Sequence, residues 1–65
     1  MIRVNGEARM LEEGANLLDF LGQEGYQAAR IAVEKNGEIV PKSSYGETML
    51  HDGDVLEIVS FVGGG

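Results

Sequence analysis

The stretch Val55-Leu56-Glu57-Ile58-Val59-Ser60-Phe61-Val62-Gly63-Gly64-Gly65 decides the fold, because it contains the longest apolar segment of the chain and leads directly into three glycines. We expect a strand over residues 55–62, in the middle of a sheet. Side chains of a strand alternate between its two faces, so Leu56 and Ile58 are predicted to face a helix and the core. Val55 and Glu57 are predicted to point outward on the opposite face.

Val59 and Phe61 share the outward parity of Glu57, so an exposed apolar patch is expected on the helix-free face, close to the glycines. Exposed apolar patches of this kind commonly mark interfaces. We therefore predict that Val59, Phe61 and Val62 contact a partner. The alternative is that a bulge turns Phe61 inward, where it caps the core.

The three glycines form a thin stalk that ends in a carboxylate. They span at most about 10 Å when extended, and without Cβ atoms they can thread a channel too narrow for other residues. The alternative is a frayed end or a cloning remnant. We expect residues 1–62 to form one domain and residues 63–65 to form a flexible tail, in which Gly63 and Gly64 thread partner active sites and Gly65 carries the reactive group.

The rest of the chain alternates in the same way between turn signals. Strands are expected at residues 1–4, 7–11, 31–35 and 38–40, with brief pairing near residues 48–50. Asn5-Gly6 and Asn36-Gly37 are favoured pairs for two-residue type I′ turns, so they join these strands into hairpins. The core is predicted to include Ile2, Val4, Leu17, Leu21, Ile31 and Val33.

A short helix of about two turns is expected between Asn16, a good N-cap, and Gly25, a common C-terminal stop. Its apolar stripe, predicted to lie in the core, consists of Leu17, Leu18, Phe20 and Leu21. An opening hairpin followed by a helix packed across a mixed sheet is an α+β arrangement, in which the first and last strands can lie side by side.

The composition limits the function. Sixty-five residues make one small domain without room for a large cleft. A net charge of −6 argues against nucleic acid and is compatible with a basic partner surface or simply with solubility. No apolar run approaches the roughly 20 residues of a membrane span, and the polar start is unlike a signal peptide. We expect a cytoplasmic chain that does not associate with membranes.

Constellations typical of enzymes and metal sites are absent from the sequence. His51 has no cysteine or second histidine to help it bind a metal. Asp52-Gly53-Asp54 lacks the ligand pattern of an EF-hand and is better explained as a turn stabilised by aspartate side chains. There is no cysteine and no phosphate-loop lysine. The chain is expected to catalyse nothing by itself and to bind no cofactor.

Three segments together resemble the ThiS family of small sulfur carrier proteins of thiamin biosynthesis. These are Asn36-Gly37-Glu38-Ile39-Val40-Pro41-Lys42, Asp52-Gly53-Asp54-Val55-Leu56-Glu57-Ile58-Val59 and Val62-Gly63-Gly64-Gly65. Asn5-Gly6-Glu7 and Glu13-Gly14-Ala15 are also similar. The resemblance implies the β-grasp, ubiquitin-like fold, with four to five strands and one helix packed across them. Lys42 replaces the arginine common in the family and lacks its bidentate fork.

The resemblance also implies a chemistry for Gly65. A ThiF-like adenylyltransferase would use ATP and magnesium to adenylate the terminal carboxylate, and a sulfur donor protein would displace AMP to leave a thiocarboxylate. Thiazole synthase (ThiG) would then take the sulfur for the thiazole ring of thiamin. The free carrier is expected to be a monomer, and storing sulfur in this way needs no cysteine.

Four alternatives remain open. The small subunit of molybdopterin synthase uses the same thiocarboxylate but typically carries prolines before the diglycine, and none is present in Ser60-Phe61-Val62. A carrier for another sulfur pathway is a close relative. A protein modifier would join Gly65 to a lysine through an isopeptide bond. A noncovalent binding module would have an inert tail.

Overall fold

A computed structural model of the chain describes residues 1–12 and 14–61. Five strands, one α-helix and two 3₁₀ helices make up this part of the chain. In chain order they are β1 (Ile2–Val4), β2 (Glu7–Arg9), α1 (Leu17–Gln23), η1 (Ala28–Arg30), β3 (Ile31–Lys35), β4 (Glu38–Val40), η2 (Lys42–Glu47) and β5 (Val55–Ser60). No helix in residues 1–12 and 14–61 has the length and apolar character that a bilayer span needs.

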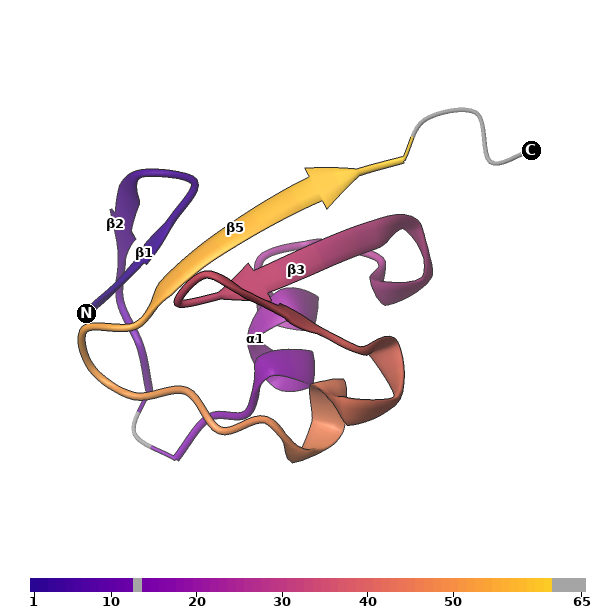
Figure 1. Cartoon of the computed structure of the whole chain (residues 1–65). Helices are drawn as coiled ribbons and strands as arrows, with labels where there is room; N and C mark the ends of the chain where they lie inside the picture. Colours follow the sequence, from indigo (N-terminus) through magenta and orange to yellow (C-terminus); the bar gives the residue numbers. More distant parts are fainter. Residues whose placement is uncertain (13, 62–65) are drawn as a thin grey trace.

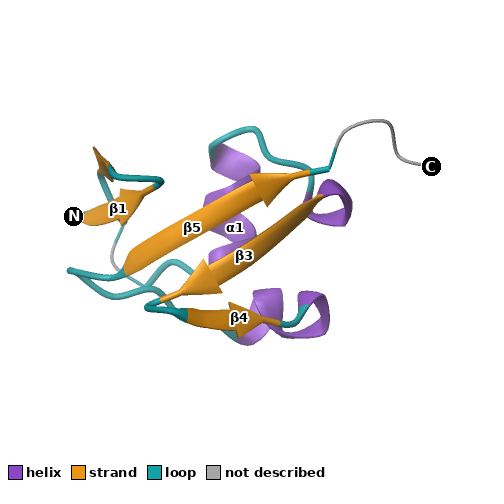
Figure 2. Cartoon of the chain, turned by 45° about the horizontal axis from the view of Figure 1, so that its top comes forward, coloured by secondary structure: helices purple, strands orange, loops and turns teal. Residues whose placement is uncertain are grey.

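The strands form one mixed sheet in the order β2-β1-β5-β3-β4. β1 and β5 are parallel, and the other neighbouring pairs are antiparallel. Helix α1 crosses one face of this sheet (Figures 1 and 2). The α+β fold with one helix across a five-stranded sheet, and the central position of the last strand, are therefore confirmed.

Strand β5 has the predicted register. Leu56 and Ile58 are buried under α1, whereas Val55 and Glu57 are exposed on the other face. The parallel pairing of Val4 with Leu56 brings the first strand of the chain beside the last. The buried core consists of Ile2, Val4, Leu17, Phe20, Leu21, Ile31, Val33, Tyr45, Leu50, Leu56 and Ile58.

Helix α1 begins where the sequence predicts. The Asn16 side chain accepts a hydrogen bond from the Asp19 backbone N–H at 2.8 Å, so Asn16 is the N-cap. Gly25 follows the helix at φ +85°, a conformation that ends a helix at little cost for glycine. The placement of Leu18 in the core was wrong, because its side chain is 46% exposed. In a helix with 3.6 residues per turn, Leu17, Phe20 and Leu21 share one face and Leu18 is rotated away from it.

Both Asn-Gly turns have the predicted conformation, with positive φ at all four residues. Strand β2 is shorter than the predicted residues 7–11, because pairing with β1 ends at Arg9. The Arg9 side chain lies at the sheet edge and bonds Glu7 and Glu24, as expected for an edge residue that reaches water. The pairing expected near residues 48–50 is reduced to one bridge, between Asn16 and Met49.

Candidate functional site

The candidate site is the end of β5, where the chain leaves the sheet. Strand β5 lies between β1 and β3, so its direction is set from both sides. The last described contact of its backbone is a hydrogen bond in which the Phe61 N–H donates to the Arg30 carbonyl at 2.7 Å. We call Ser60 and Phe61 the exit of β5.

Two apolar side chains are exposed at this exit, and we call Val59 and Phe61 the exit patch. Val59 is 60% exposed and Phe61 is 52% exposed. Val59 lies on the helix-free face opposite Ala32 of β3, which is also exposed. Phe61 therefore does not cap the core, and the alternative of an inward-turning bulge does not occur.

Lys42 contacts the exit patch. Its ammonium lies 5.5 Å from the centre of the Phe61 ring, in a cation–π arrangement, and donates to the Ala29 carbonyl at 3.0 Å. Lys42 belongs to η2 and Ala29 to η1, so two segments far apart in the sequence meet the exit. Sequence reasoning did not find this contact, because Pro41-Lys42 carries no signal that places it beside Phe61.

The helix-free face next to the exit patch is acidic. Glu34 of β3 and Glu57 of β5 are directly opposite each other, and both are exposed. Neither carboxylate forms an ion pair with another residue in the described part of the chain. Like charges opposite each other in a sheet disfavour the isolated fold slightly. A cationic group on a partner would be stabilised by this pair.

The remaining predicted site residues lie outside the described residues. These are Val62, Gly63, Gly64 and Gly65. The roles assigned to them from the sequence stay predictions.

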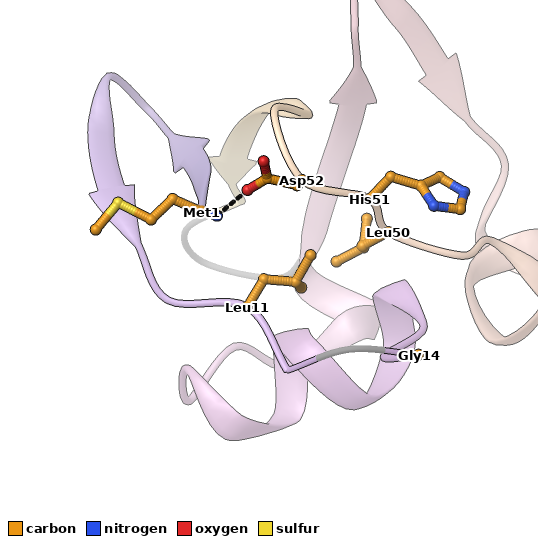
Figure 3. Close-up of a pocket in the computed structure, with 6 residues that line it drawn as sticks. All are labelled: Met1, Leu11, Gly14, Leu50, His51 and Asp52. Atoms are coloured by element: carbon orange, nitrogen blue, oxygen red, sulfur yellow. Dashed lines mark hydrogen bonds and ion pairs between the residues drawn. The ribbon is translucent and has the colours of Figure 1, made fainter.

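A hollow of about 330 Å³ lies near the opposite end of β5, lined by Met1, Leu11, Gly14, Leu50, His51 and Asp52 (Figure 3). The terminal ammonium of Met1 pairs with the Asp52 carboxylate across its rim. The His51 imidazole points away from this pair in Figure 3. Within residues 1–12 and 14–61, no group of three His, Cys, Asp or Glu side chains is arranged to hold a metal.

Asp54 shapes the turn that leads into β5. Its side chain is buried and accepts hydrogen bonds from the Asn36 amide at 3.0 Å and the His51 backbone N–H at 2.9 Å. Burial by itself would raise the pKa of this carboxyl. The hydrogen bonds from Asn36 and His51, together with the charge of Lys35, outweigh burial and hold the pKa of Asp54 below its ordinary value of 3.8. Asp54 thus stabilises the turn, as the Asp-Gly-Asp pattern predicts.

Comparisons with known proteins agree on one family. The model of the ThiS family matches residues 2–65. The sulfur carrier protein ThiS of Bacillus subtilis is 38% identical over 66 residues, which cover all of both chains. The crystal structure of the thiamine biosynthesis protein ThiS from Geobacter metallireducens superimposes with a TM-score of 0.80 at 33% identity, covering 98% of this chain and 97% of that one.

A third relative is much longer. The thiazole synthase of Paramagnetospirillum magneticum is 48% identical over 62 residues, which are 95% of this chain and 19% of that protein. The chain spans about a fifth of the length of this enzyme and of a second thiazole synthase, from Magnetococcus marinus. The sheet order, the single crossing helix and the matches along the whole chain lead to one conclusion: this chain belongs to the ThiS family and has its β-grasp fold.

Proposed function

We propose that this chain is a sulfur carrier of thiamin biosynthesis, and that the sulfur is carried on Gly65. The observation that carries the proposal is the match over full length to sulfur carrier proteins named ThiS, from Bacillus subtilis and from Thermus thermophilus. The family match extends to residue 65 and therefore includes the glycine tail.

The chemistry takes place at the Gly65 carboxylate. A carboxylate is a poor electrophile, so an activating enzyme of the ThiF type first joins it to the AMP portion of ATP, with magnesium, and releases pyrophosphate. A sulfur nucleophile then attacks the acyl carbon, and AMP leaves with the oxygen that it bonds. The product is a thiocarboxylate on Gly65, which donates its sulfur to the thiazole ring. The chain acts as a co-substrate, and ATP and magnesium belong to the activating enzyme.

We propose that the exit patch is the surface by which the carrier docks, extended by Val62. The support is the exposure of Val59 and Phe61 beside the start of the tail. The exposed Glu34 and Glu57 on the same face favour a partner surface that combines apolar and basic groups. Thiazole synthase is the second proposed partner, supported by the two thiazole synthases that contain a segment similar to this chain. We propose the cytoplasm as the compartment of these reactions.

The decisive experiment measures the intact mass of the chain. The chain is incubated with its ThiF-like enzyme, magnesium, ATP and inorganic sulfide, and is compared with a reaction without ATP. The mass is expected to rise by the difference between sulfur and oxygen, with the change confined to the C-terminal peptide. Adding thiazole synthase and its small-molecule substrates should restore the original mass. An unchanged mass after a complete reaction contradicts the proposal, and conjugates of higher mass would indicate a protein modifier.

A further inference from the structure

Two asparagines hold the backbone of β5 from opposite sides. Asn5 starts the turn between β1 and β2, and Asn36 starts the turn between β3 and β4. Both residues have positive φ, at 50° and 52°, as a type I′ turn requires. In each case the amide side chain extends from the turn to the strand next to it.

The two asparagines hold different ends of the strand. The Asn36 Oδ1 accepts from the Val55 N–H at 2.9 Å, at the first residue of β5. The Asn5 side chain binds Ile58, because its Oδ1 accepts from the Ile58 N–H at 2.7 Å and its Nδ2 donates to the Ile58 carbonyl at 3.1 Å. The Asn5 amide thus makes the same two hydrogen bonds to Ile58 that the backbone of one more β1 residue would make.

On the β1 side of β5, Asn5 makes the last hydrogen bonds that the structure describes before the exit. The ladder between β1 and β5 ends at the pair Val4–Leu56, followed by one bond from the Asn5 N–H to the Leu56 carbonyl at 2.9 Å. Even-numbered residues of β5 turn their backbone groups to this side, so Ser60 is the next in line after Ile58. Within the described residues, no hydrogen bond to Ser60 is found on that side. In the described part of the chain, the strand beyond Ile58 is therefore hydrogen-bonded on the β3 side alone.

We propose that Asn5 is a positioning residue for the tail, which fixes the direction and the reach with which the chain leaves the sheet. This inference rests on the proposed carrier function. Without the Asn5 amide, the backbone of Ile58 has no partner on the β1 side, so the end of β5, which stays paired with β3 at Val59 and Ser60, can vary in direction. The direction in which the chain leaves the sheet is then less well defined, and fewer encounters with the activating enzyme are productive. Asn5 acts through Ile58 and has no contact of its own with the reacting atoms.

The test compares Asn5→Gly with Asn36→Gly, a matched pair. Glycine adopts positive φ readily, and Gly-Gly also forms type I′ turns, so both variants keep their hairpins and lose the side-chain hydrogen bonds to β5. Asn36→Gly also loses the hydrogen bond to Asp54, so it is the more destabilised variant and makes the control more stringent. Amide hydrogen exchange measures separately how each asparagine side chain protects the backbone N–H to which it bonds. Exchange at Ile58 should accelerate at least about tenfold in Asn5→Gly alone, and exchange at Val55 should do so in Asn36→Gly alone.

Kinetics of activation then separate positioning from stability. With the wild-type chain, both variants and the activating enzyme at a temperature where all three chains are folded, pyrophosphate release gives kcat and KM. Asn5→Gly should lower kcat by about tenfold or more, since misplacement by about 1 Å is costly, and should leave KM within about twofold because the exit patch is intact. Asn36→Gly should match the wild type in both constants.

Any of three other results would contradict the positioning role of Asn5. Equal kcat values in the two variants overturn the role of Asn5, and so does unchanged exchange at Ile58 in Asn5→Gly. A rise in KM at constant kcat in Asn5→Gly also overturns it, because it would mean that Asn5 contacts the enzyme directly. If the wild-type chain itself is not activated, the carrier proposal fails and the positioning role fails with it. Activation of the wild type therefore distinguishes the two failures.

Discussion

The two ends of β5 differ in the burial and hydrogen bonding of their side chains. At its start, Asp54 is buried and accepts hydrogen bonds from Asn36 and His51, so its carboxylate is satisfied within the chain. At its exit, Val59 and Phe61 leave more than half of their side-chain surface in water. The ends are separated by six residues, or about 20 Å of strand. The hydrogen-bonded start of β5 stabilises the fold, whereas its exposed apolar exit is available to a partner.

Substitutions at the two ends of β5 should therefore affect different measurements. Changes at the exit should alter activation by the enzyme and leave the free energy of unfolding nearly constant. Changes at the start should alter the free energy of unfolding and leave activation of the folded chain nearly constant.

The largest effect is expected from one alanine added after Gly65. The reactive carboxylate then becomes an ordinary amide, so thiocarboxylate formation should be abolished, as measured by intact mass on a chain shown to be unprocessed. The control adds one alanine before Met1, near the start of β5. It should leave activation unchanged, because the exposed pair of the terminal ammonium with Asp52 contributes little stability. Thiazole formation by the intact extended chain would overturn the carrier proposal.

Deletion of Gly65 should have the next largest effect. The new terminal carboxylate on Gly64 lies about 3.5 Å short of its wild-type position. Since catalytic geometry is sensitive to displacements near 1 Å, kcat for adenylation should fall by about a hundredfold or more. Pyrophosphate release measures this effect, and an unchanged thermal midpoint verifies the fold. Wild-type kcat in the shortened chain would mean that the length of the tail is not under constraint.

Val59→Asp should weaken docking at the exit patch. Removing an apolar contact at an interface and adding a negative charge should raise KM by about tenfold, equivalent to roughly 1.4 kcal/mol. Val55→Asp is the matched control, because Val55 is exposed on the same face at the other end of β5. A KM that rises equally in both variants would show that the whole face, and not the exit patch, contacts the enzyme.

Asp54→Asn should change stability and leave KM for activation unaltered. Loss of the charge-assisted hydrogen bonds should lower the free energy of unfolding by about 1–3 kcal/mol at neutral pH, measured by urea denaturation. Because the pKa of Asp54 is lowered in the folded chain, the unfolded chain binds the proton more tightly, and stability falls as pH falls. The advantage of the wild type should thus be complete above pH 3.8 and shrink below it as Asp54 protonates. A constant difference across that range would contradict the assignment.

The sequence predicted those features of this fold that depend on local pattern. The alternation over residues 55–59 has a period of two, so it identified Leu56 and Ile58 as buried and Val59 as exposed. Asn-Gly pairs predicted both hairpins because few other residues tolerate positive φ. Leu18 was misplaced because it is apolar and lies next to the buried residues in the sequence, so its residue type alone does not distinguish it from them.

The contacts that shape the site were not predictable in the same way. The Asn5 side chain reaches Ile58, 53 positions away, and Lys42 reaches Phe61. Both contacts depend on which strands become neighbours, and this information is not contained in the local pattern of either residue. The predicted roles of Gly63, Gly64 and Gly65 remain predictions, to be tested by the experiments on the tail.

The position of β5 also determines when the sheet becomes complete. Among the described strands, β1 pairs with β2, and β3 pairs with β4, but no ladder joins these hairpins except through β5. A chain emerging from the ribosome can form either hairpin early, yet the sheet cannot close until residues 55–60 arrive. The contacts between β1 and β5 span more than fifty residues, which makes this step the slow and cooperative one. Val59 enters the sheet in that same step, so an incompletely folded chain presents no assembled exit patch to a partner.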